Sequence, residues 1–216
     1  MSDSPPGVAD LLGVLAYAEL TAFLRLAEDA TRYAPTLTDR AALGDLAATE
    51  YAHFRLLHDR ITSLGVDPEE AMAPFVGPLD DWHTQTVPGD WLEALVKAYV
   101  GTGIALDFYR EAAAYVDAGT RELVEEVLAD EGRSQFAVER VGAAIREDPR
   151  QAGRLALWAR RMVGEALSQG QHVIEARPEL AKLLVEAAGE DVTRMFARLT
   201  EAHGRRMAAL GLTPGP

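Results

Sequence analysis

The sequence predicts an all-α fold, a four-helix bundle with a long crossover between its second and third helices and two additional C-terminal helices. Apolar residues recur every three or four positions along most of the chain, which is the periodicity of helices with one buried face. No stretch alternates with period two for long enough to form a strand. One long irregular stretch, residues 66–89, holds four of the eleven prolines and can connect opposite ends of a bundle.

The first two helices are predicted at residues 8–33 and 38–64. The first ends before Pro35, because the residue that precedes a proline disfavours the helical conformation. The second begins at Thr38, whose hydroxyl can cap the free amides, and it stops at Gly65. A link this short makes the two helices an antiparallel hairpin.

The third and fourth helices are predicted at residues 90–117 and 120–147, as a second hairpin. Asp90 and Glu93 form a capping-box pattern at the start of the third helix, and Thr120 caps the fourth. Two short links and one long crossover are the connectivity of a ferritin-like four-helix bundle.

The two additional helices are predicted to belong to the same domain as the bundle. One opens at Asp148-Pro149, where a capping acid precedes a first-turn proline, and the other follows Pro178. Because 216 residues with 48% apolar content can bury one large core, we expect a single domain. Its limits are residues 1–216, with the bundle core at 8–147 and the additional helices at 149–210.

The composition restricts the compartment and the kind of metal site. No leader-like segment and no apolar run of about 18 residues is present, so we expect a cytoplasmic protein with no membrane partner. With no cysteine, the chain has no thiolate nucleophile and no cysteine-ligated zinc or iron–sulfur site. Any metal must therefore be held by carboxylate and imidazole groups.

The charge is distributed unevenly along the chain. The net charge of −13 argues against general nucleic-acid binding. Residues 1–149 hold 11 Lys and Arg against 27 Asp and Glu, net −16, whereas residues 150–216 hold 10 against 7, net +3. Arginines in this last third form either a basic face or an ordinary solvated surface, and the second interpretation is favoured. They are Arg154, Arg160, Arg161, Arg194, Arg198, Arg205 and Arg206. Arginine outnumbers lysine 19 to 2, which we attribute to coding bias.

Two acids and an imidazole interrupt the apolar faces of the first hairpin. Glu19 lies on the same face of the first helix as leucine and phenylalanine residues. Glu50 and His53, three residues apart, lie on the apolar face of the second helix. Folding the chain back near residue 34 brings Glu19 and Glu50 to the same height, so we expect them to be neighbours.

A second pair of acids is predicted in the second hairpin. Glu131 interrupts the apolar face of the fourth helix, and folding back near residue 118 or 119 places it level with Asp107 or Leu106. Several carboxylates in an apolar interior repel one another unless protons or a cation reduce their charge. Iron or manganese accepts carboxylate and imidazole ligands, which makes Glu19, Glu50, His53, Asp107 and Glu131 candidate metal ligands.

Each candidate also has a structural interpretation. Asp107 and Glu131 can form ion pairs with a nearby arginine, such as Arg110 or Arg133, in place of binding metal. The other histidines are not favoured as ligands: His58 is expected at the surface, His83 and His203 are expected to be exposed, and His172 shares a face with Glu165 at a spacing that carries little information.

The pattern resembles a known family. Glu19 followed by Glu50-Tyr51-Ala52-His53 resembles the first half-site of the ferritin-like diiron carboxylate proteins. The segments GIALDFYREAA, DEGRSQFAVERV and HGRRMAALGL resemble the bacterial tRNA-hydroxylase-like proteins, relatives of enzymes that hydroxylate a modified adenosine in tRNA. The second half-site departs from the family pattern, because Ser134 stands where a histidine is expected and Arg133 precedes it.

The resemblance implies a function and leaves an alternative open. It implies a non-haem, diiron-type hydroxylase or oxidoreductase that uses one or two iron ions, or manganese, with dioxygen and an electron donor. Its substrate would be a small apolar or prenyl-like group, carried on tRNA in the family, and a second copy of the chain is a candidate partner. The alternative is a ferritin-like scaffold with a degenerate metal site that acts as a non-catalytic binding or assembly protein. No catalytic residue is assigned beyond the ligands.

Overall fold

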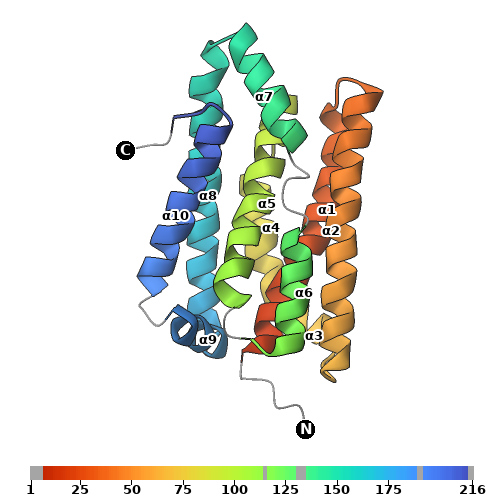
Figure 1. Cartoon of the computed structure of the whole chain (residues 1–216), viewed down its shortest axis with the longest axis vertical. Helices are drawn as coiled ribbons and strands as arrows, with labels where there is room; N and C mark the ends of the chain where they lie inside the picture. The colour runs from red at the N-terminus through yellow and green to blue at the C-terminus, as the bar shows by residue number, and fades with distance from the viewer. Residues whose placement is uncertain (1–6, 114–115, 130–134, 189–191, 214–216) are drawn as a thin grey trace.

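The computed structural model describes residues 7–113, 116–129, 135–188 and 192–213, and these residues form an elongated all-α bundle (Figure 1). Helices α1 (Val8–Tyr33) and α2 (Leu37–Ser63) form the predicted antiparallel hairpin. The cap of α2 is Thr36, whose hydroxyl accepts a hydrogen bond from the Asp39 amide at 3.1 Å, so the prediction of Thr38 was wrong by two residues. Gly65 takes a φ of +76°, which glycine adopts without strain, and follows the end of the helix as predicted.

The stretch predicted to be irregular is largely helical, which corrects the sequence interpretation. It contains α3 (Pro68–Met72), the 3₁₀ turn η1 (Ala73–Phe75) and α4 (Val76–Gln85). Three of its four prolines, Pro68, Pro74 and Pro78, lie in the first turns of these elements, where a helix has no use for the missing amide hydrogen, so they start helices and do not break them. Pro88 lies in the link between α4 and α5. The Trp82 indole donates to the carbonyl oxygen of Met162 at 3.1 Å and ties α4 to α8.

The second hairpin consists of α5 (Trp91–Ala113), α6 (Ala118–Ala129) and α7 (Gln135–Glu147). The range predicted as one fourth helix corresponds to α6 and α7, with residues 130–134 outside the described part of the chain. The capping box at Asp90 and Glu93 is confirmed, because the Glu93 amide donates to Asp90 Oδ1 at 3.0 Å. The cap of α6 is Asp117, whose Oδ1 accepts from the Thr120 amide at 3.1 Å, and the prediction of Thr120 as cap was wrong.

Three further helices complete the described fold: α8 (Arg150–Ala176), α9 (Pro178–Ala188) and α10 (Val192–Ala209). In Figure 1, α8 and α10 run beside α5 on the side opposite the α1–α2 hairpin. The Arg206 guanidinium of α10 lies against Gly103 of α5, where a Cβ would force that side chain to shift. Among the described residues, no helix is long and apolar enough to cross a membrane.

Candidate metal centre

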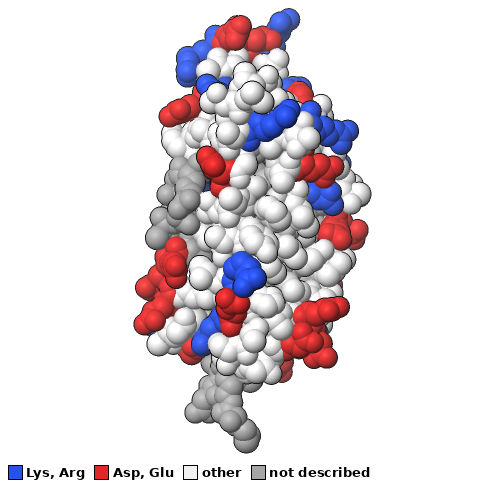
Figure 2. Space-filling model, turned by 90° about the vertical axis from the view of Figure 1, so that its right-hand side faces the viewer, with Lys and Arg blue, Asp and Glu red and all other residues white. Residues whose placement is uncertain are grey.

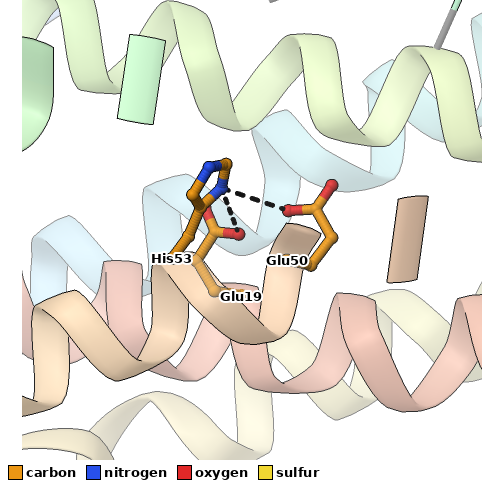
Figure 3. A group of neighbouring side chains, drawn as sticks. All are labelled: Glu19, Glu50 and His53. Atoms are coloured by element: carbon orange, nitrogen blue, oxygen red, sulfur yellow. Dashed lines mark ion pairs between the residues drawn. The ribbon is translucent and has the colours of Figure 1, made fainter. Parts of the chain in front are cut away.

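Glu19, Glu50 and His53 lie together in the interior between α1 and α2, as Figure 3 shows. Only 3%, 4% and 6% of their surfaces are exposed. One ligand atom from each residue lies within 4.8 Å of the other two. The expectation that Glu19 and Glu50 would be neighbours is confirmed, and helical periodicity explains it, since each residue sits on the apolar face of its own helix.

The group is linked by short polar contacts. His53 Nδ1 lies 3.5 Å from Glu19 Oε2 and 3.9 Å from Glu50 Oε2. On the far side, the Thr102 hydroxyl of α5 donates a hydrogen bond to Glu50 Oε1 at 3.0 Å. Thr102 therefore fixes one oxygen of Glu50 and leaves the other directed at His53. No local sequence signal identified Thr102, because its role depends on how α5 packs against α2.

The electrostatic environment of Glu50 is unfavourable for a free carboxylate. Burial raises the pKa of Glu50 well above its usual value, and the charge of Glu19 and a hydrogen bond with Glu19 raise it further. His53 and the Thr102 hydroxyl oppose this rise but do not cancel it. Without a cation, burial beside Glu19 therefore favours a retained proton on Glu50.

This donor set fits a metal ion. Two carboxylates and one imidazole offer oxygen and nitrogen ligands of the kind that iron and manganese accept. A cation between Glu19 and Glu50 would take the place of the retained proton and relieve their repulsion. Among the described residues, this trio is the one group of acids and histidines whose ligand atoms lie close enough together to hold a metal ion. The chain can thus supply three ligands at one buried point.

The other predicted ligands are placed differently. Asp107 is not part of the trio: its carboxylate pairs with Arg110 at 2.8 Å and with Arg206 of α10. The structural interpretation, an ion pair with Arg110, is therefore what the geometry shows for this residue. Glu131, and with it Arg133 and Ser134, lies outside the described residues. The ligand role of Glu131 stays a prediction.

A cavity of about 260 Å³ borders the trio. Glu19 and Glu50 form part of its wall, and most of the rest is apolar. Contributions come from α1, α4, α5, α8, α9 and α10, including Leu15, Phe108, Ile174, Leu184, Phe196 and Leu199. A mainly apolar cavity with a few converging polar groups is the usual form of a site for a small molecule. The candidate metal centre thus lies at the edge of a space that can admit an apolar ligand.

The same cavity has a second polar region that the sequence analysis did not identify. Asp29, His83 and Lys97 all border it, and each is less than a tenth exposed. His83 was expected to be exposed, as was His203, and both expectations were wrong, with exposures of 7% and 3%. The sequence did contain a signal for Lys97. Lys97, Gly101, Ile104 and Phe108 follow one another at helical spacing on one face of α5, and Lys97 is the charged residue in this otherwise uncharged series.

The fold and the buried carboxylate–imidazole group together define a ferritin-like helical protein with a candidate metal centre. A family model described as a ferritin-like domain of actinomycetes matches residues 4–187, and the chain belongs to this family. The ferritin-like part of the predicted resemblance is confirmed, whereas the narrower tRNA-hydroxylase-like group stays a prediction.

One solved structure has a similar fold. The chain is similar to "Protein 19 with aldehyde deformylating oxidase activity from Synechococcus", with a TM-score of 0.74 and 19% sequence identity. The match covers 96% of this chain and 91% of that chain. At this identity the likeness shows the fold. No curated protein matches the sequence.

Proposed function

We propose that the protein is a metal-dependent oxidoreductase that uses dioxygen to oxidise a small apolar substrate bound in its internal cavity. The observation that carries this proposal is the buried Glu19–Glu50–His53 trio at the wall of that cavity. Burying two carboxylates so close together costs free energy, and a bound cation is the simplest way to recover it.

The residues have distinct roles in this proposal. Glu19, Glu50 and His53 would hold iron or manganese, and Thr102 orients Glu50 through its hydrogen bond. Bound iron with an open coordination position would supply the reactivity toward dioxygen. The apolar wall excludes water and accepts the substrate, and an external reductant would supply electrons.

The comparisons support an oxidase class more than a tRNA-modifying enzyme. The Synechococcus protein of similar fold has an oxidase activity in its title. In contrast, four of the seven arginines that could form a basic face pair with acids: Arg154, Arg198, Arg205 and Arg206. On the face shown in Figure 2, basic side chains are separated by acidic and uncharged ones. We therefore leave tRNA out of the proposal.

A second candidate function is a non-catalytic binding protein that keeps the cavity without the chemistry. The observation that favours it is Asp107, which pairs with two arginines and so needs no metal. Under this alternative, the trio would hold a proton in place of an ion. The two candidates differ in whether the protein binds metal and consumes oxygen.

The test of the proposal is oxygen consumption by protein loaded anaerobically with Fe(II) and supplied with a small-molecule reductant and medium-length aliphatic compounds. We expect substrate to stimulate oxygen uptake by wild type. Glu50→Gln should abolish the stimulation through loss of metal. Ala105→Phe, which fills the cavity, should abolish it while the metal content is retained. Wild type that retains no metal and takes up no oxygen with any such compound would favour the binding protein.

A further inference from the structure

Lys97 is the buried cation in the second polar region of the cavity. It lies on α5, is 7% exposed and borders the same space as Glu19 and Glu50. Its Nζ donates a hydrogen bond to the carbonyl oxygen of Thr86 at 2.7 Å and lies 5.1 Å from the centre of the Trp82 ring. Within the described part of the chain, one strong hydrogen bond and one ring contact are few partners for a buried ammonium, which has three hydrogens to donate.

The neighbours of Lys97 are also titratable and buried. Asp29 of α1 and His83 of α4 border the cavity with it. The Nδ1 atom of His83 is buried without a hydrogen-bond partner among the described residues. The Asp29 carboxylate attracts Lys97 electrostatically, while Arg25 repels it. The region therefore combines an amine, an acid and an imidazole at one wall of an apolar cavity.

The choice of lysine at this position is informative. The chain has 21 basic residues, of which only Lys97 and Lys182 are lysine, so arginine is the default cation. Arginine keeps its charge at every relevant pH, whereas a buried lysine can lose its proton and become a nucleophile. Burial lowers the pKa of Lys97 to about 8, so a useful fraction of the amine is neutral near physiological pH.

We propose that Lys97 forms an imine with an aliphatic aldehyde that enters the cavity. The apolar wall would hold the alkyl chain, and the amine would react with the carbonyl carbon. On α5, Lys97 precedes Thr102, the hydrogen-bond partner of Glu50, by five residues, about 7.5 Å along the helix axis, so the amine and the metal trio occupy different parts of one cavity. An aldehyde fixed at Lys97 would extend its chain along the cavity wall.

The reaction needs no oxidant or reductant. The neutral Nζ attacks the carbonyl carbon, an N–C bond forms, and the oxygen takes a proton to give a carbinolamine. The C–O bond then breaks and a C=N bond forms, while the two amine hydrogens leave with the oxygen as water. Asp29, whose pKa burial raises to about 6, can donate and recover the protons that these steps move.

The test is reductive trapping, which does not depend on the metal. Native wild-type protein, free of metal, is incubated with octanal and cyanoborohydride, which reduces an imine to a stable amine. Intact mass and peptide mapping then locate the adduct. We expect one octyl group on Lys97, exceeding the label on exposed Lys182 by a factor of ten or more, because far more of the buried amine is neutral. Protein unfolded in guanidinium should label both lysines equally.

Matched variants sharpen the result. Lys97→Arg keeps the charge and should remove the adduct, whereas Lys182→Arg should leave it unchanged. Because mapping of the native wild type gives the answer alone, a Lys97 variant that fails to fold does not affect the test. Label on Lys182 that equals or exceeds the label on Lys97 would overturn the proposal and leave Lys97 as a structural partner of Asp29. A clear adduct in protein that never binds metal would support the imine site and reject the oxidase.

Discussion

Glu50 and Asp107 are two inward-facing acids with opposite environments. Glu50 lies beside a second carboxylate and an imidazole, with a threonine hydroxyl as a further partner. Asp107 lies between two arginines, one from its own helix and one from α10. Both acids interrupt apolar helix faces in the sequence, so the pattern alone does not distinguish them.

The comparison shows that a buried acid indicates a metal only when no fixed cation already balances it. Arg110 and Arg206 supply the positive charge that Asp107 requires. In the part of the chain that the structure describes, no lysine or arginine forms an ion pair with Glu50, and burial with Glu19 raises its pKa. We infer that the α1–α2 hairpin carries the ion and that Asp107 joins α5 to α10.

The largest expected effect is on the free energy of unfolding, when the ion pair between Asp107 and Arg206 is lost. Arg206→Ala should lower the free energy of unfolding by about 3 kcal/mol, because it leaves a largely buried carboxylate with a single arginine. Arg205→Ala provides the matched control, since the neighbouring Arg205 pairs with Glu201 at the surface and should cost less than about 0.5 kcal/mol. Urea unfolding measures both, and equal effects would show that the Asp107 pair contributes no more than a surface pair.

Glu50 should respond in the opposite way. Glu50→Gln in the metal-free protein should change the free energy of unfolding by less than about 1 kcal/mol or increase it, because glutamine is uncharged like the protonated acid and avoids the cost of a buried carboxylate. Asp107→Asn should destabilise, because it leaves Arg206 unbalanced. If Glu50→Gln destabilises as much as Asp107→Asn, Glu50 is a structural acid and the comparison fails.

The sequence was sufficient to predict contacts between residues of a single hairpin. Helical periodicity and the fold-back near residue 34 placed Glu19 beside Glu50, and the three-residue spacing placed His53 with them. The partner of Asp107 could not be predicted in this way. Arg206 follows it by 99 residues, and its approach depends on how α10 packs over Gly103.

Dependence on packing between distant helices also explains why the sequence did not predict the helices of the crossover or the role of Lys97. Prolines in residues 66–89 indicated irregular structure, but three of the four lie in first turns, where they are compatible with helices. Only the tertiary packing of α4 against α8 shows this. Lys97 stood in an uncharged series on α5, yet its importance depends on Asp29 and His83 from other helices. Local patterns gave the helix faces, and the packing between hairpins determined which polar groups meet.

The pH dependence of trapping separates the amine region from the metal trio. A lowered pKa means that Lys97 becomes nucleophilic as the pH rises through about 8, so labelling should increase and level off above that value. Labelling of Lys182 should continue to rise toward pH 10. The charged and titratable groups around Lys97 are Asp29, Arg25 and Glu28 of α1 and His83 of α4. The same midpoint for both lysines would contradict the buried environment as the cause.

The smallest expected effect is that of Asp29 on this midpoint. Asp29→Asn removes the carboxylate that favours the charged form of Lys97, so the midpoint of labelling should fall by about half a pH unit. Asp45→Asn, on α2 and away from the cavity, is the control and should leave the midpoint in place. A rise in the midpoint for Asp29→Asn would show that Asp29 does not stabilise the ammonium.

The most direct measurement of the central claim is anaerobic titration of the purified protein with Fe(II) or Mn(II), followed by removal of free metal and elemental analysis. If the trio binds metal, wild type and Arg205→Ala should retain metal near stoichiometry, and Glu50→Gln should retain almost none. Added metal should raise the melting temperature of wild type and leave that of Glu50→Gln unchanged. Wild type that retains no more metal than Glu50→Gln, with no change in melting temperature, would contradict the assignment of Glu19, Glu50 and His53 as a metal centre.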